Sequence, residues 1–302
     1  MPRILHFGLG NFARAHLADY TQDAGGWDIV GVSLRAGTVR DGLAAQGFAY
    51  DLDVQGQGIK RIDVLKDILV APENPDAVLG QITAPRVQVI SATVTEKGYH
   101  LDGNGVLDLQ ETVIRDELAK KAPRSLIGYL AHGLAMRTTP VTVLSCDNMP
   151  GNGDRLGAAV QRFGRCAGLS INFEHITFPN AMVDRITPAS AQPDVVHTEA
   201  FREWVIEDRF AAPRPDWPVV QFVQDVAPHE LRKLRMLNGA HSYLAYAGCL
   251  AGYVHVHEAI NDAQLRKSAR DVMDQAALTL PQAVQGQAEG YIPTGTNCVG
   301  HA

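Results

Sequence analysis

The sequence predicts an α/β fold, with a doubly wound, mostly parallel sheet followed by a mainly α-helical C-terminal part. First, the apolar run Ile4–Phe7 leads through a glycine-rich turn and a helix-compatible stretch to a second apolar run, Asp28–Leu34, which is the order of a βαβ unit. Second, Val87–Val94 and Val141–Cys146 are nearly continuous apolar runs, typical of strands buried in a parallel sheet. Third, helical patterns dominate after a cluster of prolines.

The elements between these landmarks follow from local patterns. Phe48–Val54 and Ile59–Val64 alternate like the two arms of a β-hairpin around a turn that contains two glycines. Short strand-like pieces continue to Asp184, and Phe201–Phe210 is compatible with either a helix or a strand. Helices are predicted at Arg14–Gln22, Pro75–Gln81, Glu111–Lys121, Ser125–Arg137, Asp154–Cys166, Pro228–Tyr246 and Asn261–Ala276.

The length of 302 residues fits two domains or one large domain. Pro213, Pro215 and Pro218 break the chain, so we expect a first domain over residues 1–218 and a second, partial helical domain over residues 219–302. The final stretch, Pro281–Ala302, is polar, glycine-rich and aperiodic.

Composition excludes several classes of protein. The 27 Lys and Arg against 33 Asp and Glu give a formal net charge of −6, with no basic run that would indicate nucleic acid or membrane lipid as a partner. We expect no membrane span and no signal peptide, and therefore a cytoplasmic protein. Cys146, Cys166, Cys249 and Cys298 form no Cys-x-x-Cys pair, so we expect no metal site and four reduced thiols, with Cys146 and Cys249 in cores.

The glycine turn after the first strand predicts a dinucleotide site in a Rossmann-like domain. Gly8, Gly10 and Ala13 match the pattern G-x-G-x-x-A, with Asn11 and Phe12 between them. The first glycine permits a tight turn, the second lets backbone approach a pyrophosphate, and a small third residue permits close packing of helix on strand. An ordinary strand–helix turn is the alternative.

The cofactor expected at this turn is NAD, with NADP possible. Dinucleotide folds usually carry an acidic residue near the end of the second strand, where it binds the ribose hydroxyls. Here no acid occurs before Asp41, and Arg35 is placed where it would accept a 2′-phosphate. Arg35 is equally compatible with a solvated turn, so the choice between NAD and NADP stays open.

The predicted helix Pro228–Tyr246 gathers polar side chains suited to alcohol oxidation. At 3.6 residues per turn, Glu230, Lys233, Asn238 and His241 fall within an arc of about 140°. A desolvated Lys has a lowered pKa, so its neutral amine can take a hydroxyl proton while hydride leaves. Asn offers an amide donor to the developing alkoxide, and His can bind the reacting hydroxyl. A solvated helix of mixed charge is the alternative interpretation.

Asn148 is a second candidate amide donor, because it follows the strand Val141–Cys146 and ligands sit beyond the carboxyl ends of strands in open α/β sheets. A turn or cap Asn is its commoner use. No Tyr has a Lys four positions later, which argues against the short-chain dehydrogenases, and the ligand set of a zinc alcohol dehydrogenase is missing. We interpret His255 and His257 as surface residues.

Six segments together give the chain a specific resemblance to a known family. In this order they resemble the mannitol dehydrogenase and fructuronate (mannonate) reductase family, the polyol-specific long-chain dehydrogenases. The matching segments are Gly8–His16, Val94–Tyr99, Ser145–Asn148, Phe178–Pro188, Trp204–Asp208 and Lys233–Ser242.

The resemblance implies a metal-independent, NAD(P)-dependent hydride transfer at a secondary alcohol of a linear polyol, ketose or sugar acid. It implies that Lys233 is the general base, that Asn148 and Asn238 form the oxyanion hole, that His241 binds the substrate hydroxyl, and that Glu230 lies on the proton path. It further implies that Asp184 and Arg185 lie near the nicotinamide and the substrate. We expect a monomer or a weak homo-oligomer.

The chain departs from the family pattern in two respects. The family usually has His where this chain has Ala13. Its members are also about half as long again, with C-terminal helices that cover the substrate, so the second domain is expected to be truncated here. A non-catalytic dinucleotide-binding remnant and a sugar-sensing protein are therefore the alternatives to an active enzyme.

Overall fold

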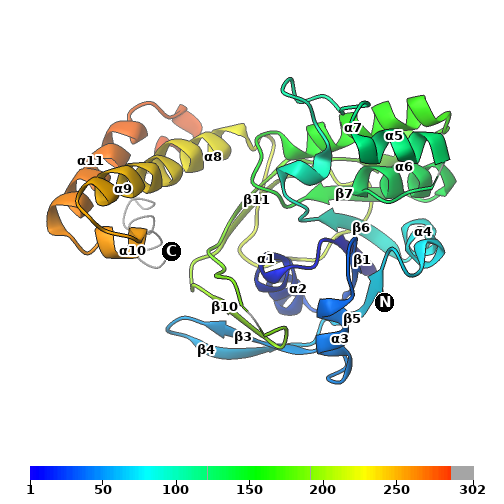
Figure 1. Ribbon diagram of the computed structural model, residues 1–302, viewed down its shortest axis with the longest axis horizontal. Helices are drawn as coiled ribbons and strands as arrows, with labels where there is room; N and C mark the ends of the chain where they lie inside the picture. Colours follow the sequence, from blue (N-terminus) through cyan, green and yellow to red (C-terminus); the bar gives the residue numbers. More distant parts are fainter. Residues whose placement is uncertain (121, 191, 287–302) are drawn as a thin grey trace.

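A computed structural model describes residues 1–120, 122–190 and 192–286, and its largest element is a six-stranded parallel sheet (Figure 1). The strands lie in the order β5-β2-β1-β6-β7-β8, so the order reverses between β1 and β6, as in a Rossmann fold. The predicted fold class is confirmed. The strands are β1 (Arg3–Phe7), β2 (Asp28–Ser33), β5 (Leu65–Val70), β6 (Val87–Ala92), β7 (Val141–Ser145) and β8 (Ile176–Thr177).

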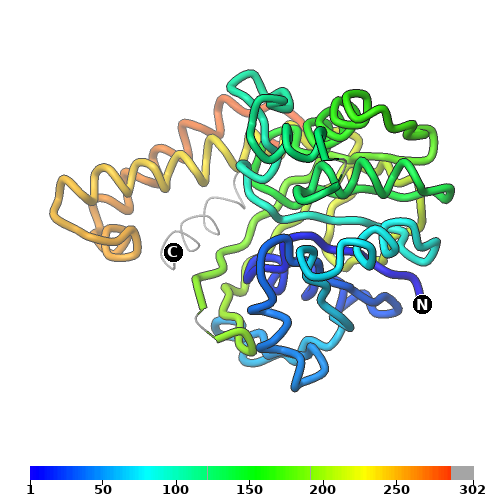
Figure 2. Tube along the Cα trace, turned by 45° about the vertical axis from the view of Figure 1, so that its right-hand side comes forward, coloured from blue at the N-terminus to red at the C-terminus, as the bar shows by residue number. Residues whose placement is uncertain are grey.

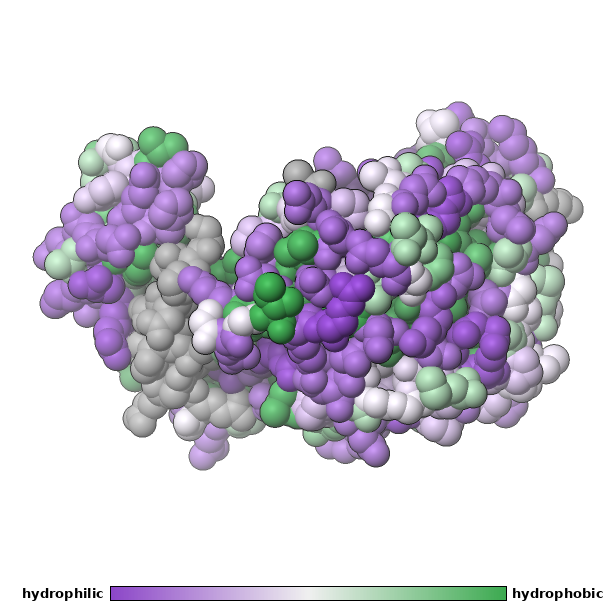
Figure 3. All heavy atoms as spheres, turned by 90° about the horizontal axis from the view of Figure 1, so that it is seen from below, coloured by the Kyte–Doolittle hydropathy of each residue, from purple (hydrophilic) through white to green (hydrophobic). Residues whose placement is uncertain are grey.

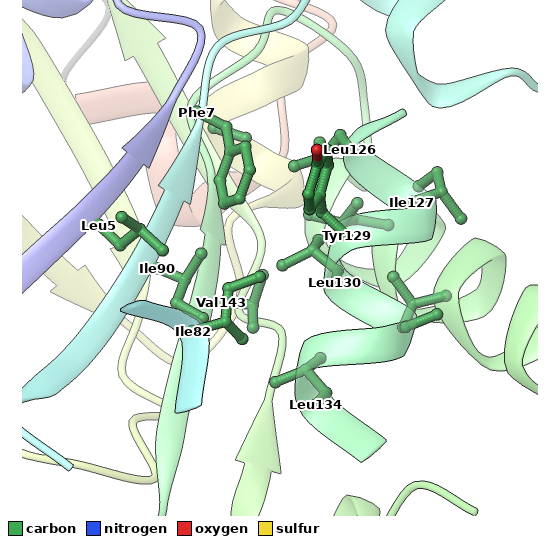
Figure 4. Packing of buried hydrophobic residues seen from close by; sticks show 14 of the residues in the cluster. Leu5, Phe7, Ile82, Ile90, Leu126, Ile127, Tyr129, Leu130, Leu134 and Val143 are labelled. Atoms are coloured by element: carbon green, nitrogen blue, oxygen red, sulfur yellow. The ribbon is translucent and has the colours of Figure 1, made fainter. Parts of the chain in front are cut away.

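Helices cover both faces of this sheet because its strands are apolar on both sides. On one face, Phe7 and Val143 point toward Tyr129 and Leu130 of the helix α6 (Leu126–Met136) (Figure 4). The other face packs against the helices that follow the glycine turn and against Trp204. The helices are α1 (Asn11–Ala15), α2 (Leu17–Ala24), α3 (Thr38–Ala44), α4 (Pro75–Thr83), α5 (Thr112–Lys120), α6 (Leu126–Met136) and α7 (Asn152–Ala167), with short 3₁₀ turns at Glu96–Tyr99 (η1) and Phe173–His175 (η2).

Two small three-stranded sheets complete the first part of the chain. The predicted hairpin is confirmed as β3 (Tyr50–Val54) and β4 (Gly58–Ile62), to which β10 (Val195–Thr198) adds in parallel. The ambiguous stretch Phe201–Phe210 contains a strand. That strand lies in the second sheet, which consists of β9 (Ala181–Asp184), β11 (Glu203–Glu207) and β12 (Gln221–Val223).

The last part of the chain is a helical arm that extends away from the main sheet (Figures 1 and 2). The long predicted helix is continuous, but Lys233–Asn238 forms a π-helical turn (η3) between α8 (Ala227–Arg232) and α9 (Gly239–Leu250). The prediction of regular α-helix is therefore wrong for these six residues. The arm ends with α10 (Val256–Ala259) and α11 (Ala263–Ala277), and its own apolar cluster centres on Met236, Leu244 and Met273.

The arm also corrects one prediction about the cysteines. Cys146 is buried as predicted, whereas Cys249 is exposed on α9, where it faces away from the arm's apolar cluster. Figure 3 shows a largely hydrophilic surface with scattered apolar side chains. Within the described ranges, no helix is both long and apolar enough to span a membrane. The predicted aperiodic stretch falls mostly on residues 287–302, and Cys298 with it, outside the described residues.

Candidate active site

The glycine turn connects β1 to α1 at the point where the strand order of the main sheet reverses. Gly8 has φ +85°, and a Cβ there would lie 2.1 Å from the carbonyl oxygen of Thr93, so only glycine fits. A Cβ on Gly10 would meet nothing closer than 4.0 Å, which leaves open space above the turn. Ala13 is 1% exposed where α1 packs on the sheet. These positions have the three properties that a pyrophosphate-binding turn requires.

Two residues of the glycine turn make contacts within the protein. The Asn11 side chain donates to the carbonyl oxygen of Pro188 over 3.3 Å and accepts from Arg14 over 2.6 Å, which ties the loop after β9 to the turn. Phe12 stacks on the buried His16 ring with a centroid separation of 4.9 Å. Arg35 follows β2 and is exposed, at the position where dinucleotide folds bind the 2′-phosphate of an NADP ribose.

Lys233 lies where α8 passes into the π-helical turn, and its side chain is nearly buried, with the residue 9% exposed. Its Nζ donates to Asn148 Oδ1 over 3.1 Å and to the carbonyl oxygen of Val183 over 2.5 Å. Asp184 Oδ1 lies 3.8 Å from the same nitrogen. Burial lowers the pKa of Lys233, while the carboxylates of Asp184 and Glu203 partly oppose that shift.

A cavity of about 220 Å³ opens beside the Lys233 amine. It lies beyond the carboxyl end of β7 in the main sheet, the position at which ligands of α/β proteins bind, and three residues of β9 form part of its wall. Glu230, Asn148 and Asn238 line it together with Lys233. The other lining residues are Glu96, Asp147, Met149, Pro150, Ala181, Met182, Val183 and Leu234.

Two further predicted residues lie close to this lysine. Glu230 accepts a hydrogen bond from the backbone N–H of Gly151 over 3.1 Å, and burial raises the pKa of its carboxyl. Burial lowers the pKa of His241, and the nearby charge of Lys233 lowers it further. His241 Nε2 is buried and has no hydrogen-bond partner among the described residues, and His241 is not among the residues that line the cavity.

The π-helical turn explains how residues so far apart along the helix serve one cavity. A π-helix bonds residue i to residue i+5, so its turn is wider than that of an α-helix. Asn238 lies five residues after Lys233, and the wide turn therefore brings the two side chains closer to one face than a regular helix would. Single π-helical turns occur frequently at functional sites.

Asp184 and Arg185 take separate positions although they are adjacent in sequence. Asp184 lies within reach of the lysine amine, as described above. The Arg185 guanidinium forms a buried ion pair with Asp19 over 2.6 Å and also donates to the carbonyl oxygens of Ala15 and Glu199. It joins β9 to the helices behind the glycine turn, and it is not among the residues that line the cavity.

Asp147 is a residue of the site that the sequence interpretation did not single out. Its carboxylate accepts from the backbone N–H of Val94 over 3.2 Å, from that of Thr95 over 3.0 Å and from the Tyr99 hydroxyl over 2.6 Å. Thr93 abuts Gly8, and Asn148 follows Asp147. The Asp147 carboxylate therefore binds the loop that follows Thr93 beside the glycine turn, while the next residue, Asn148, binds the Lys233 amine. The sequence presents Val94–Tyr99 as a motif but does not identify Asp147 as its partner.

Comparison with known proteins gives matches over most of the chain. Residues 2–219 match the family "Mannitol dehydrogenase Rossmann domain", and residues 225–292 match "Mannitol dehydrogenase C-terminal domain". A mannitol 2-dehydrogenase of Phaeosphaeria nodorum is 36% identical over 94% of this chain and 57% of its own length. D-mannonate oxidoreductase of Escherichia coli K12 is 36% identical over 93% of this chain and 66% of its own.

A solved structure gives the same picture. The Pseudomonas fluorescens mannitol 2-dehydrogenase in a ternary complex with NAD and D-mannitol superimposes with a TM-score of 0.88 and 33% identity, over 99% of this chain and 68% of that one. The chain thus spans between about half and two thirds of the length of the curated relatives it matches.

Proposed function

The chain belongs to the mannitol dehydrogenase family, and we propose that it transfers hydride between a nicotinamide cofactor and a secondary alcohol of a linear polyol or sugar acid. One observation carries the proposal: a desolvated lysine amine opens onto a cavity that two asparagine side chains also line. Desolvation favours the neutral amine, which is the form that can accept a hydroxyl proton.

The proposed cofactor is NAD, with NADP as the alternative. The turn at Gly8, Gly10 and Ala13 fits the pyrophosphate, because Gly10 leaves open space above the first N–H groups of α1. When bound, the nicotinamide supplies the hydride acceptor for alcohol oxidation and the hydride donor for ketone reduction. Exposed Arg35 would hold the 2′-phosphate of NADP, since no acid precedes Asp41 after the second strand.

Lys233 is the proposed general base, and its two hydrogen bonds orient its amine. The carbonyl of Val183 and Asn148 Oδ1 each accept one N–H, so the remaining position on nitrogen can face a substrate hydroxyl. Because Asn148 uses its amide oxygen on the lysine, its amide N–H groups are left for the substrate oxygen. Asn238 would add a second donor, and the two would stabilise negative charge as the proton leaves.

Glu230 and His241 are proposed to manage protons and substrate hydroxyls. The raised pKa of Glu230 brings its carboxyl nearer to the range in which it can exchange protons with Lys233 and water. The lowered pKa of His241 keeps its imidazole neutral, so that it can donate to or accept from a substrate hydroxyl without adding charge. Asp184 would orient the lysine from its other side.

Two organisational expectations accompany this proposal. We propose a division into a dinucleotide-binding part, residues 1–218, and a helical part, residues 219–302. We also propose a monomer or a weak homo-oligomer. Limited proteolysis tests the division, and light scattering at several concentrations tests the oligomeric state.

A cofactor and substrate screen tests the function directly. NAD and NADP are each combined with mannitol and arabinitol for oxidation, and NADH and NADPH with fructose and fructuronate for reduction, while absorbance at the nicotinamide band is followed. We expect turnover with at least one pair and its loss in Lys233→Met. Dinucleotide binding without turnover on any substrate would favour the non-catalytic remnant over the enzyme.

A further inference from the structure

His6 is a fully buried imidazole near the carboxyl end of β1, and the proposed reaction does not use it. A buried polar ring in an apolar strand costs free energy unless both of its nitrogens are bonded. Here both are: Nδ1 lies 2.8 Å from Ser91 Oγ and Nε2 lies 3.0 Å from Thr93 Oγ1. The partners lie on β6 and directly after it, across the point where the strand order reverses.

The Thr93 hydroxyl determines which group donates and which accepts in both hydrogen bonds of His6. Thr93 donates its only hydroxyl proton to the carbonyl oxygen of Gly8 over 2.7 Å. Its oxygen must therefore accept from His6, which places the ring proton on Nε2. Nδ1 is then an acceptor and receives the hydroxyl proton of Ser91. Burial lowers the pKa of His6 to about 4, so the ring holds the single proton that this chain of hydrogen bonds requires.

The series of hydrogen bonds from Ser91 through His6 and Thr93 ends at the carbonyl group of Gly8 in the glycine turn. Gly8 O also accepts from the backbone N–H of Gly10 over 2.7 Å, while Gly8 N–H donates to Val32 O over 3.0 Å. The peptide between Gly8 and Leu9 is thus held by donors from the turn and from Thr93. Its orientation decides where the following N–H groups point, which are the groups that a dinucleotide phosphate would meet.

We propose that Ser91, His6 and Thr93 form a hydrogen-bonded relay that positions the Gly8–Gly10 turn for the dinucleotide phosphates. This inference rests on the proposed function and adds three positioning residues to it, none of which is expected to touch the substrate. Loosening the relay lets the Gly8 peptide rotate, so the affinity for the dinucleotide falls while the cavity beside Lys233 is unchanged.

The test compares dinucleotide affinity in matched variants. Thr93→Val keeps the shape of the side chain and removes the hydroxyl, whereas Thr93→Ser keeps the hydroxyl. Thr142→Val is the control, because this buried threonine of β7 bonds Thr177 and Ala211 and makes no hydrogen bond to the glycine turn within the described part of the chain. Dissociation constants for NADH and NADPH are measured by fluorescence titration, and folding is checked by thermal denaturation.

We expect Thr93→Val to raise the dissociation constant about 10-fold, which corresponds to about 1.4 kcal/mol. Thr93→Ser and Thr142→Val should stay within threefold of the unsubstituted protein, and Ser91→Ala should show an intermediate loss. In turnover, the KM for the dinucleotide should rise while the kcat and the KM for polyol hold. If Thr93→Val does not fold, Ser91→Ala decides in its place.

The outcomes separate the relay from the proposed function. Unchanged affinity in folded Thr93→Val and Ser91→Ala would overturn the relay while leaving dinucleotide binding intact. An equal loss in Thr142→Val would overturn it too, because the effect would then reflect general loosening of the sheet. If the unsubstituted protein binds neither NADH nor NADPH, the proposed function fails and the relay fails with it.

Discussion

Changing Asn148 to aspartate puts the proposed role of Lys233 to a quantitative test. The substitution Asn148→Asp keeps the shape of the side chain and places a negative charge 3.1 Å from the lysine Nζ. At that distance two unit charges attract by about 1.3 kcal/mol in water, which is about one pKa unit. Asn148 is exposed while the amine is nearly buried, so the effective dielectric is below that of water and about one unit is the smallest shift expected.

The direction in which the pH–rate profiles shift follows from which protonation form of Lys233 reacts. Alcohol oxidation needs the neutral amine, so the rise of kcat/KM with pH should move upward by about one unit or more. Ketone reduction needs the ammonium, so its fall at high pH should move upward by the same amount. Loss of one amide donor should also lower the plateau of both profiles, by about 10²- to 10³-fold.

The assay is a set of initial rates between pH 6 and 10.5, recorded in both directions on the polyol–ketose pair that the screen identifies. The position of the midpoint reports the lysine, and the height of the plateau reports the lost donor. Asn104→Asp, the same change at an exposed residue that is not among those lining the cavity, controls for net charge. A midpoint that stays in place while the plateau falls would refute Lys233 as the titrating base. NMR titration of the lysine ε-carbons gives the same pKa without turnover.

Three further predictions address the base, the cofactor and the fold. Lys233→Met should lower kcat by about 10²- to 10⁴-fold with NADH affinity kept, and an activity close to that of the unsubstituted protein in steady-state assays would exclude the lysine as base. Arg35→Glu should weaken NADPH at least about 10-fold more than NADH, as measured by fluorescence titration; equal effects would place Arg35 outside the cofactor site. Asp19→Asn should reduce the free energy of unfolding in urea by about 3–5 kcal/mol, because its buried carboxylate pairs with three cations. Burial raises the pKa of Asp19, but these pairs outweigh burial and lower it overall, so the difference should shrink as the pH falls below 4; a difference that is constant with pH would contradict this.

Local patterns predicted the parts of the fold in which sequence neighbours cooperate. The first strand with its glycine turn, the hairpin of β3 and β4, and the buried strand β7 all read correctly because their apolar periodicity is local. The strand β5 was missed. Lys66 and Asp67 interrupt its apolar run, and such charges are common on an edge strand, which pairs on one side only.

In the candidate site too, the features set by local helical spacing are predictable from the sequence, and those set by tertiary packing are not. Helical spacing placed Glu230, Lys233 and Asn238 on one face, and all three line the cavity, whereas His241 is not among its lining residues. The π-helical turn has no sequence signature, and it changes the geometry of that group. Arg185 is adjacent to Asp184 in sequence, yet its contacts are with Asp19 and with backbone far along the chain. Such partners depend on the packing of β9 against α2, which no local pattern records.

The position of Asp147 explains why the Val94–Tyr99 segment is part of the site. Thr95 has φ +65° and ψ 162°, a conformation that costs a β-branched residue about 1–3 kcal/mol, and the Asp147 carboxylate holds it there through the Thr95 N–H. Glu96 follows and lines the cavity, while Thr93 on the other side holds the carbonyl of Gly8. This strained loop therefore lies between the glycine turn and the wall of the cavity. In the proposed reaction, this segment would fix the distance between the dinucleotide at the glycine turn and the substrate in the cavity, and it would supply no reacting group.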